Sequence, residues 1–102
     1  MSAPLVVERG PDDSIAVAGR IDVSNAASAL AAGDPLSAVT ARTDVDLKGL
    51  ESADSVTLAV LLAWSARARH NGGALVFRDV SPRLRSIAHL SDAEDLLGIG
   101  SP

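Results

Sequence analysis

Asp54 and Ser55 are the residues of this sequence whose types and position best fit a functional site. They stand where a connecting segment meets an apolar helical pattern. Backbone N–H groups at the start of a helix lack partners within the helix and lie at the positive end of its dipole, so a phosphoryl group on Ser55 would be stabilised there. Aspartate and serine are also preferred N-cap residues. The pair therefore predicts either a phosphoacceptor with its acidic neighbour or a helix cap.

The other side chains predict no catalytic residue, no metal and no cofactor. The chain has no cysteine, which excludes disulfides, thiolate nucleophiles and thiolate metal sites. Neither His70 nor His89 is spaced from a serine and a carboxylate in a recognisable triad. Gly72-Gly73 lacks the lysine of a phosphate-binding loop. We therefore expect a protein that is not an enzyme.

The composition narrows the kinds of partner. The 102 residues carry a net charge of −4, and the aromatic residues are Trp64 and Phe77, so we expect no nucleic acid. The longest apolar run, Val56–Ala63 with Thr57 inside it, is far shorter than the roughly 20 residues of a membrane span. Met1–Pro4 shows no basic region followed by an apolar stretch. These features predict a cytoplasmic protein without direct membrane insertion.

The first half of the chain predicts a hairpin followed by a helix. Leu5–Glu8 is a short β-like run, and Ile15–Ile21 alternates apolar with smaller or polar residues. An alanine-rich helix is expected over Asn25–Ala32, with Asp22 or Ser24 as its cap.

The second half predicts alternating strands and helices. Thr43–Leu47 is expected to be a strand with Val45 and Leu47 on one face, and a connector follows over Lys48–Ala53. A helix from Asp54-Ser55 to His70 has an apolar face of Leu58, Leu61, Leu62, Ser65 and Ala68. Further elements are expected at Ala74–Phe77 (strand), from Ser81-Pro82 (helix), and from Ser91 through Leu97 (a short helix opened by a capping box with Glu94).

This order of elements predicts the fold class. Strands separated by helices imply a largely parallel sheet, to which the opening hairpin adds an antiparallel pair. We therefore expect one α/β domain over residues 1–102, with its core at about 5–97. Its sheet should be mixed, largely parallel and of about four strands, with helices packed on it.

The sequence resembles the STAS domain from about Leu5 to Leu97. The resemblance rests on Asp46-Leu47, on Asp54-Ser55 before the leucine-rich helix that Leu58 opens, and on Gly19-Arg20-Ile21-Asp22. Anti-sigma-factor antagonists, anion-transporter tails and a subunit of the Mla phospholipid-transport ABC system share this domain. The C-terminal half looks most similar to the Mla subunit.

The resemblance implies a non-enzymatic adaptor that binds and supports the cytoplasmic ATPase of a Mla-type ABC system, which maintains outer-membrane lipid asymmetry. The protein would then lie at the inner membrane through its partner. The residues expected to bind that partner are Ser55, Val56, Thr57, Val60 and Trp64, supported by the acidic Asp22 and Asp54. The alternative is an anti-sigma-factor antagonist that binds a kinase and is switched by phosphorylation of Ser55.

One of these positions leaves a structural alternative open, and another departs from the pattern of the family. Trp64 lies off the strict apolar stripe, so it is either part of a partner surface or packed against a neighbouring strand or helix. Thr57 belongs to a Val56-Thr57 pair where the family usually has small residues, often glycine, which puts extra bulk beside Ser55.

Overall fold

The strands and helices follow one another in the predicted order up to residue 90. A computed structural model describes residues 4–10, 14–33, 41–95 and 97. Its elements are β1 (Val6–Arg9), β2 (Ile15–Gly19), α1 (Ala26–Ala32), β3 (Arg42–Leu50), α3 (Ser55–His70), β4 (Ala74–Arg78) and α4 (Pro82–Leu90).

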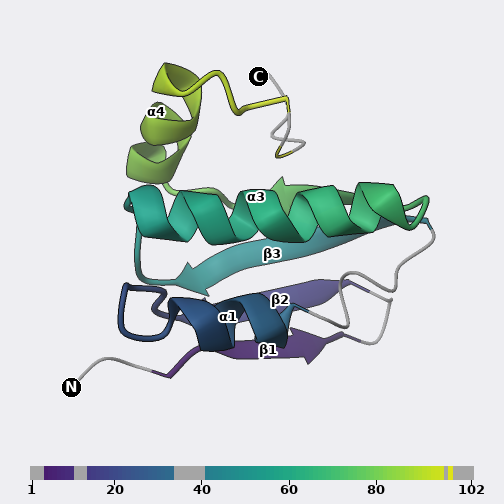
Figure 1. Cartoon of the computed structure of the whole chain (residues 1–102), viewed down its shortest axis with the longest axis horizontal. Helices are drawn as coiled ribbons and strands as arrows, with labels where there is room; N and C mark the ends of the chain where they lie inside the picture. Colours follow the sequence, from purple (N-terminus) through teal and green to yellow (C-terminus); the bar gives the residue numbers. More distant parts are fainter. Residues whose placement is uncertain (1–3, 11–13, 34–40, 96, 98–102) are drawn as a thin grey trace.

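The four strands form one mixed sheet in the order β1-β2-β3-β4. β1 pairs antiparallel with β2, whereas β2–β3 and β3–β4 are parallel, with Val45 opposite both Ile15 and Phe77. This confirms the predicted fold class. Because parallel strands end at the same edge of the sheet, the segments that lead into α1, α3 and α4 all leave from that edge. In Figure 1 it is the left-hand side, where the arrowhead of β3 and the start of α3 lie.

Alternating side chains of the strands face the helices. Figure 1 shows α1 and α3 on one face of the sheet, and α3 contacts β4, α1 and α4. Val17 on β2, Val45 and Leu47 on β3, and Phe77 on β4 are buried under this helical layer. Asp44 on β3 points the other way and is exposed. The predicted two faces of β3 are therefore confirmed.

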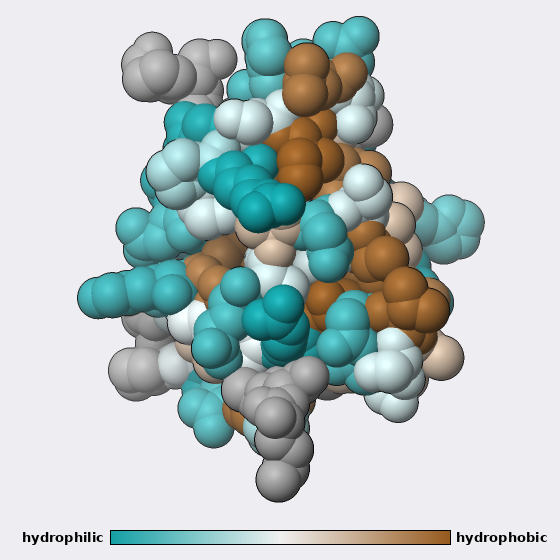
Figure 2. All heavy atoms as spheres, turned by 90° about the vertical axis from the view of Figure 1, so that its left-hand side faces the viewer, coloured by the Kyte–Doolittle hydropathy of each residue, from teal (hydrophilic) through white to brown (hydrophobic). Residues whose placement is uncertain are grey.

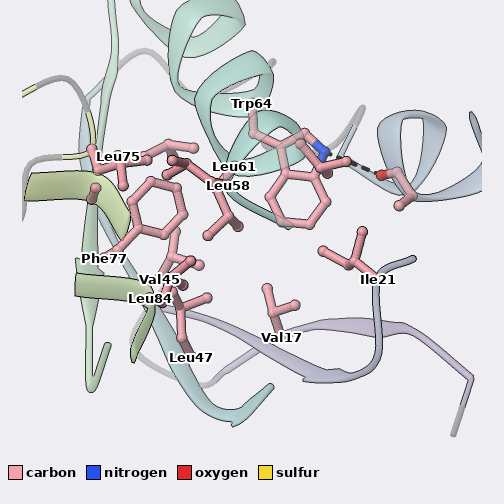
Figure 3. Close-up of a cluster of buried hydrophobic side chains, with 14 of the residues drawn as sticks. Val17, Ile21, Val45, Leu47, Leu58, Leu61, Trp64, Leu75, Phe77 and Leu84 are labelled. Atoms are coloured by element: carbon pink, nitrogen blue, oxygen red, sulfur yellow. Dashed lines mark hydrogen bonds between the residues drawn. The ribbon is translucent and has the colours of Figure 1, made fainter. Parts of the chain in front are cut away.

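The core joins the inner face of the sheet to α3 (Figure 3). Its largest fully buried side chain is Trp64, which lies between α3 and α1. The Trp64 Nε1–H donates a hydrogen bond to the Ala29 carbonyl oxygen at 3.1 Å, so burying the indole leaves no polar atom unpaired.

The buried face of α3 is wider than the predicted apolar stripe. In addition to Leu58 and Leu61, the side chains of Thr57, Val60 and Trp64 are buried, and together they form a second helical stripe. The reason is that α3 contacts α1 and α4 as well as the sheet. A helix with neighbours on several sides buries more than one stripe.

Two predicted elements differ in the structure. β3 continues through Leu50, so the expected connector starts later. Instead of opening a short helix, Ser91 follows the end of α4, and Glu94 hydrogen-bonds His89. With its side chain bound to His89, Glu94 does not complete the capping box, and residues 91–95 form turns.

Candidate partner-binding site

The start of α3 separates the two roles predicted for Asp54 and Ser55. Asp54 is the N-cap: its backbone is extended, and its Oδ1 accepts the Thr57 N–H at 2.9 Å. Ser55 is the first residue of the helix, and its side chain is exposed. The capping role thus belongs to Asp54, and the hydroxyl of Ser55 faces solvent at a helix start.

A pair of buried hydroxyls lies directly beneath this helix start. Ser52, in the connector after β3, and Thr57, in the first turn of α3, are 5% and 0% exposed. Their hydroxyl oxygens are 2.8 Å apart. Ser52 Oγ accepts the Ile21 N–H at 2.9 Å, and Thr57 Oγ1 lies 2.9 Å from Asp54 Oδ1 and 3.3 Å from the Ile21 carbonyl oxygen. The pair therefore touches three segments of the chain.

The number of hydrogens fixes the direction of these bonds. Each hydroxyl carries one hydrogen, and an ionised carboxylate can only accept. The arrangement that satisfies every group has Thr57 Oγ1–H donating to Asp54 Oδ1, and Ser52 Oγ–H donating to Thr57 Oγ1. Ile21 N–H, Ser52, Thr57 and Asp54 then form one continuous chain of donors and acceptors.

Asp22 organises the loop between β2 and α1. Its Oδ1 accepts the backbone N–H of Ser24 and of Asn25, at 2.9 and 3.2 Å, and also the Ser24 hydroxyl. Asn25 Oδ1 accepts the Asp22 N–H in return at 2.8 Å, while its Nδ2 donates to the Arg20 carbonyl oxygen. Asp22 therefore supports the loop through local bonds, and Val23 at its tip is 82% exposed.

Both acidic residues of the site are favoured in their charged form. The backbone hydrogen bond from Thr57 is the main reason that the pKa of Asp54 lies below its usual value. The hydrogen bond from the Ser24 hydroxyl does the same for the pKa of Asp22. The positive charge of Arg20 lowers both pKa values further. Ser55 therefore stands beside an ionised Asp54 at neutral pH.

Two of the five residues expected to contact a partner lie at the surface, and three do not. Ser55 is exposed and Val56 is half-buried. The expectation for Thr57, Val60 and Trp64 was wrong, because their side chains are 0%, 3% and 0% exposed. Thr57 is used in the hydroxyl pair and Trp64 in the contact with α1.

Two features of the site had no signal in the sequence. Ser52 stood in an expected connector, and only the fold brings it to the backbone of Ile21. Val23 stood between two candidate caps.

Figure 2 looks onto this end of the molecule, where hydrophobic areas, one of them in the upper part over α4, alternate with hydrophilic ones.

The described part of the chain holds no group of three or more His, Cys, Asp or Glu residues that could bind a metal ion. No helix within the described ranges has the length and apolarity needed to cross a membrane.

A four-stranded mixed sheet, with helices on one face and an exposed serine at a helix start, defines an α/β domain of the STAS type. The family model described as "Mlab, STAS domain" matches residues 6–98, and the chain belongs to this family of STAS domains. Such domains are generally non-catalytic binding or regulatory modules.

A solved structure has the same fold. It is an anti-sigma-factor antagonist (STAS) domain protein from Planctomyces limnophilus, 17% identical, with a TM-score of 0.66 over 90% of this chain and 85% of that chain. No curated protein matches the sequence.

Proposed function

We propose that this protein is an adaptor subunit that binds the ATPase of a Mla-type phospholipid-transport ABC system and supports its activity. The observation that carries the proposal is the match of residues 6–98 to the family model with the Mlab description. The adaptor would use the exposed end of the molecule where α3 begins, with Ser55 and Val56 as contacts.

The geometry of this end suits a protein partner. Ser55 offers a small hydroxyl without charge, the half-buried Val56 adds apolar area, and the neighbouring loop presents Val23. A valine side chain exposed on a loop held by its own hydrogen bonds loses little freedom on binding. Such a surface would support the ATPase by binding one of its conformations more tightly than the others.

The second candidate is an anti-sigma-factor antagonist that is switched at Ser55. Its support is the exposure of Ser55 at the start of α3, beside the N-cap Asp54. Phosphorylation would add nearly two negative charges next to the ionised Asp54, and a partner surface that fits a neutral hydroxyl would then be repelled.

Capture of the tagged protein from its native cell separates the two proposals. Recovery of an ABC ATPase in near-equal amount supports the adaptor. Recovery of a kinase-like anti-sigma factor, together with stoichiometric phosphoserine in the intact mass of the purified protein, supports the switch. If neither partner is recovered, both proposals fail.

A charge variant connects the captured partner to the site. Ser55→Glu should abolish capture, because a carboxylate would replace the neutral hydroxyl at the contact. Ser86→Glu is the matched control, since Ser86 is also an exposed helical serine but lies on α4. Equal loss in both variants, or in neither, would contradict the placement of the contact at Ser55.

A further inference from the structure

We propose that Ser52 and Thr57 are positioning residues of the partner surface, although neither side chain reaches it. Their buried hydroxyls hold the loop after β2 against the first turn of α3, so that Val23 and Ser55 are presented together. This inference rests on the proposed use of that end of the molecule for binding.

The bonds of the hydroxyl pair join parts of the chain that are far apart in the sequence. Ser52 Oγ accepts the Ile21 N–H across 31 positions of sequence, and Thr57 Oγ1, which accepts the Ser52 O–H, lies 3.3 Å from the Ile21 carbonyl oxygen, 36 positions away. Ile21 is itself 0% exposed and directly precedes the loop. The hydroxyl pair is thus a direct connection between the loop after β2 and the start of α3.

The loop between β2 and α1 is held together by its own hydrogen bonds. The side chains of Asp22 and Asn25 accept each other's backbone N–H, Asp22 also accepts the Ser24 N–H, and Asn25 Nδ2 donates to the Arg20 carbonyl oxygen, all within five positions. These local bonds fix the shape of the loop but not its place relative to α3. A body that is held internally moves as a unit, so its contacts with Ser52 and Thr57 contribute directly to where Val23 lies relative to the start of α3.

The free energy of burying the two hydroxyls favours one position of the loop. Leaving a buried hydroxyl without a hydrogen-bond partner costs more free energy than losing a hydrogen bond at the surface. In the described residues every buried side-chain nitrogen or oxygen has a hydrogen-bond partner. The arrangement that satisfies Ser52, Thr57 and Ile21 N–H therefore favours one position of the loop over others.

Amide hydrogen exchange of the isolated protein tests the connection without any partner. Ser52→Ala removes the acceptor of the Ile21 N–H, so exchange at Ile21 should rise about tenfold. Thr57→Val should raise it in the same direction, because it removes the acceptor of the Ser52 hydroxyl while its backbone N–H still bonds Asp54. Thr57→Ser keeps the hydroxyl and should restore slow exchange.

Ser65→Ala is the matched control. Ser65 is a buried serine of the same helix, 2% exposed, and its loss should leave exchange at Ile21 at the wild-type rate. Unchanged exchange at Ile21 in Thr57→Val, or the same increase in Ser65→Ala, would overturn the connection.

Binding to the captured partner tests the positioning role. We expect Thr57→Val to weaken binding about tenfold and Thr57→Ser to bind like wild type, with Ser65→Ala unaffected. If Thr57→Val raises exchange at Ile21 but binds normally, the positioning role is wrong while the adaptor proposal stands. If wild type binds no ATPase, the proposed function fails, and with it the role of the pair in binding.

Discussion

Gly33 and Trp64 lie so close that only a hydrogen atom fits on the glycine Cα. A Cβ built on Gly33 would lie 2.1 Å from Nε1 and 2.3 Å from Cδ1 of the indole. The backbone at Gly33 has a φ of −83°, which any residue can adopt, so the requirement for glycine here is steric. Together with the bond from Trp64 to the Ala29 carbonyl, this contact seats the end of α1 on α3.

Gly33→Ala is therefore expected to destabilise the protein by about 1–3 kcal/mol, the usual range for overpacking. It should also shift the fluorescence of Trp64, the only tryptophan of the chain. Gly72→Ala is the comparison: a Cβ there meets nothing within 4 Å, although its φ of +88° disfavours alanine. Chemical denaturation followed by fluorescence measures both. A native spectrum that changes equally in the two variants would contradict the contact.

Trp64→Ala should behave as a core truncation and lower the free energy of unfolding by about 3–5 kcal/mol. This follows from its full burial and replaces the expectation of a surface contact. Leu90→Ala serves as the control, because Leu90 is 85% exposed and its loss should change stability by no more than about 0.5 kcal/mol. A small loss of stability in Trp64→Ala would show that the indole is not in the core.

Asp54→Ala should lower the free energy of unfolding by about 1 kcal/mol, the usual effect of removing an N-cap, whereas Asp54→Asn should keep most of the cap. The pKa of Asp54 is lowered by folding, so its ionisation stabilises the protein above the unfolded-state value near 3.8. That stability is lost as the pH falls through the lower folded-state pKa. The advantage of wild type over Asp54→Asn should therefore shrink in acid, and an advantage that grows on acidification would refute this assignment.

His89 and Glu94 should show a pH dependence of the opposite sign. His89 Nδ1–H donates a hydrogen bond to Glu94 Oε1 at 2.7 Å, and this bond raises the pKa of His89 above its usual 6.5. The pair therefore stabilises the turn after α4 fully below pH 6.5, and loses this effect as the pH rises through the folded-state pKa. NMR titration of the imidazole should give a value above 6.5 that falls in Glu94→Gln. An unchanged titration in that variant would exclude the interaction.

Most of the fold could be predicted from local patterns. The alternation in Ile15–Gly19 and in β3, and the N-caps at Asp54 and Ser81, depend on residues close together in sequence. Periodicity is a property of a single element, so the sequence alone was sufficient for it. Capping was less certain: the sequence left Asp54 and Ser55 open for α3, and the cap expected at Asp22 or Ser24 is Asn25. The short helix expected from Ser91 failed because Glu94 bonds a residue of the preceding helix, which a local pattern does not reveal.

In the candidate site, too, some features follow from the local sequence and others only from tertiary packing. The sequence by itself determined that Asp54 and Ser55 stand at a helix start, because the pattern lies within one turn, and the structure decided that Asp54 is the cap. The tertiary structure alone decided that Thr57, Val60 and Trp64 are buried, since α1 and α4 cover flanks of α3 that the pattern left open. It also brought Ser52 to Ile21, 31 positions away. Burial and hydrogen bonding between distant segments depend on which elements pack together, and no spacing within one element specifies that.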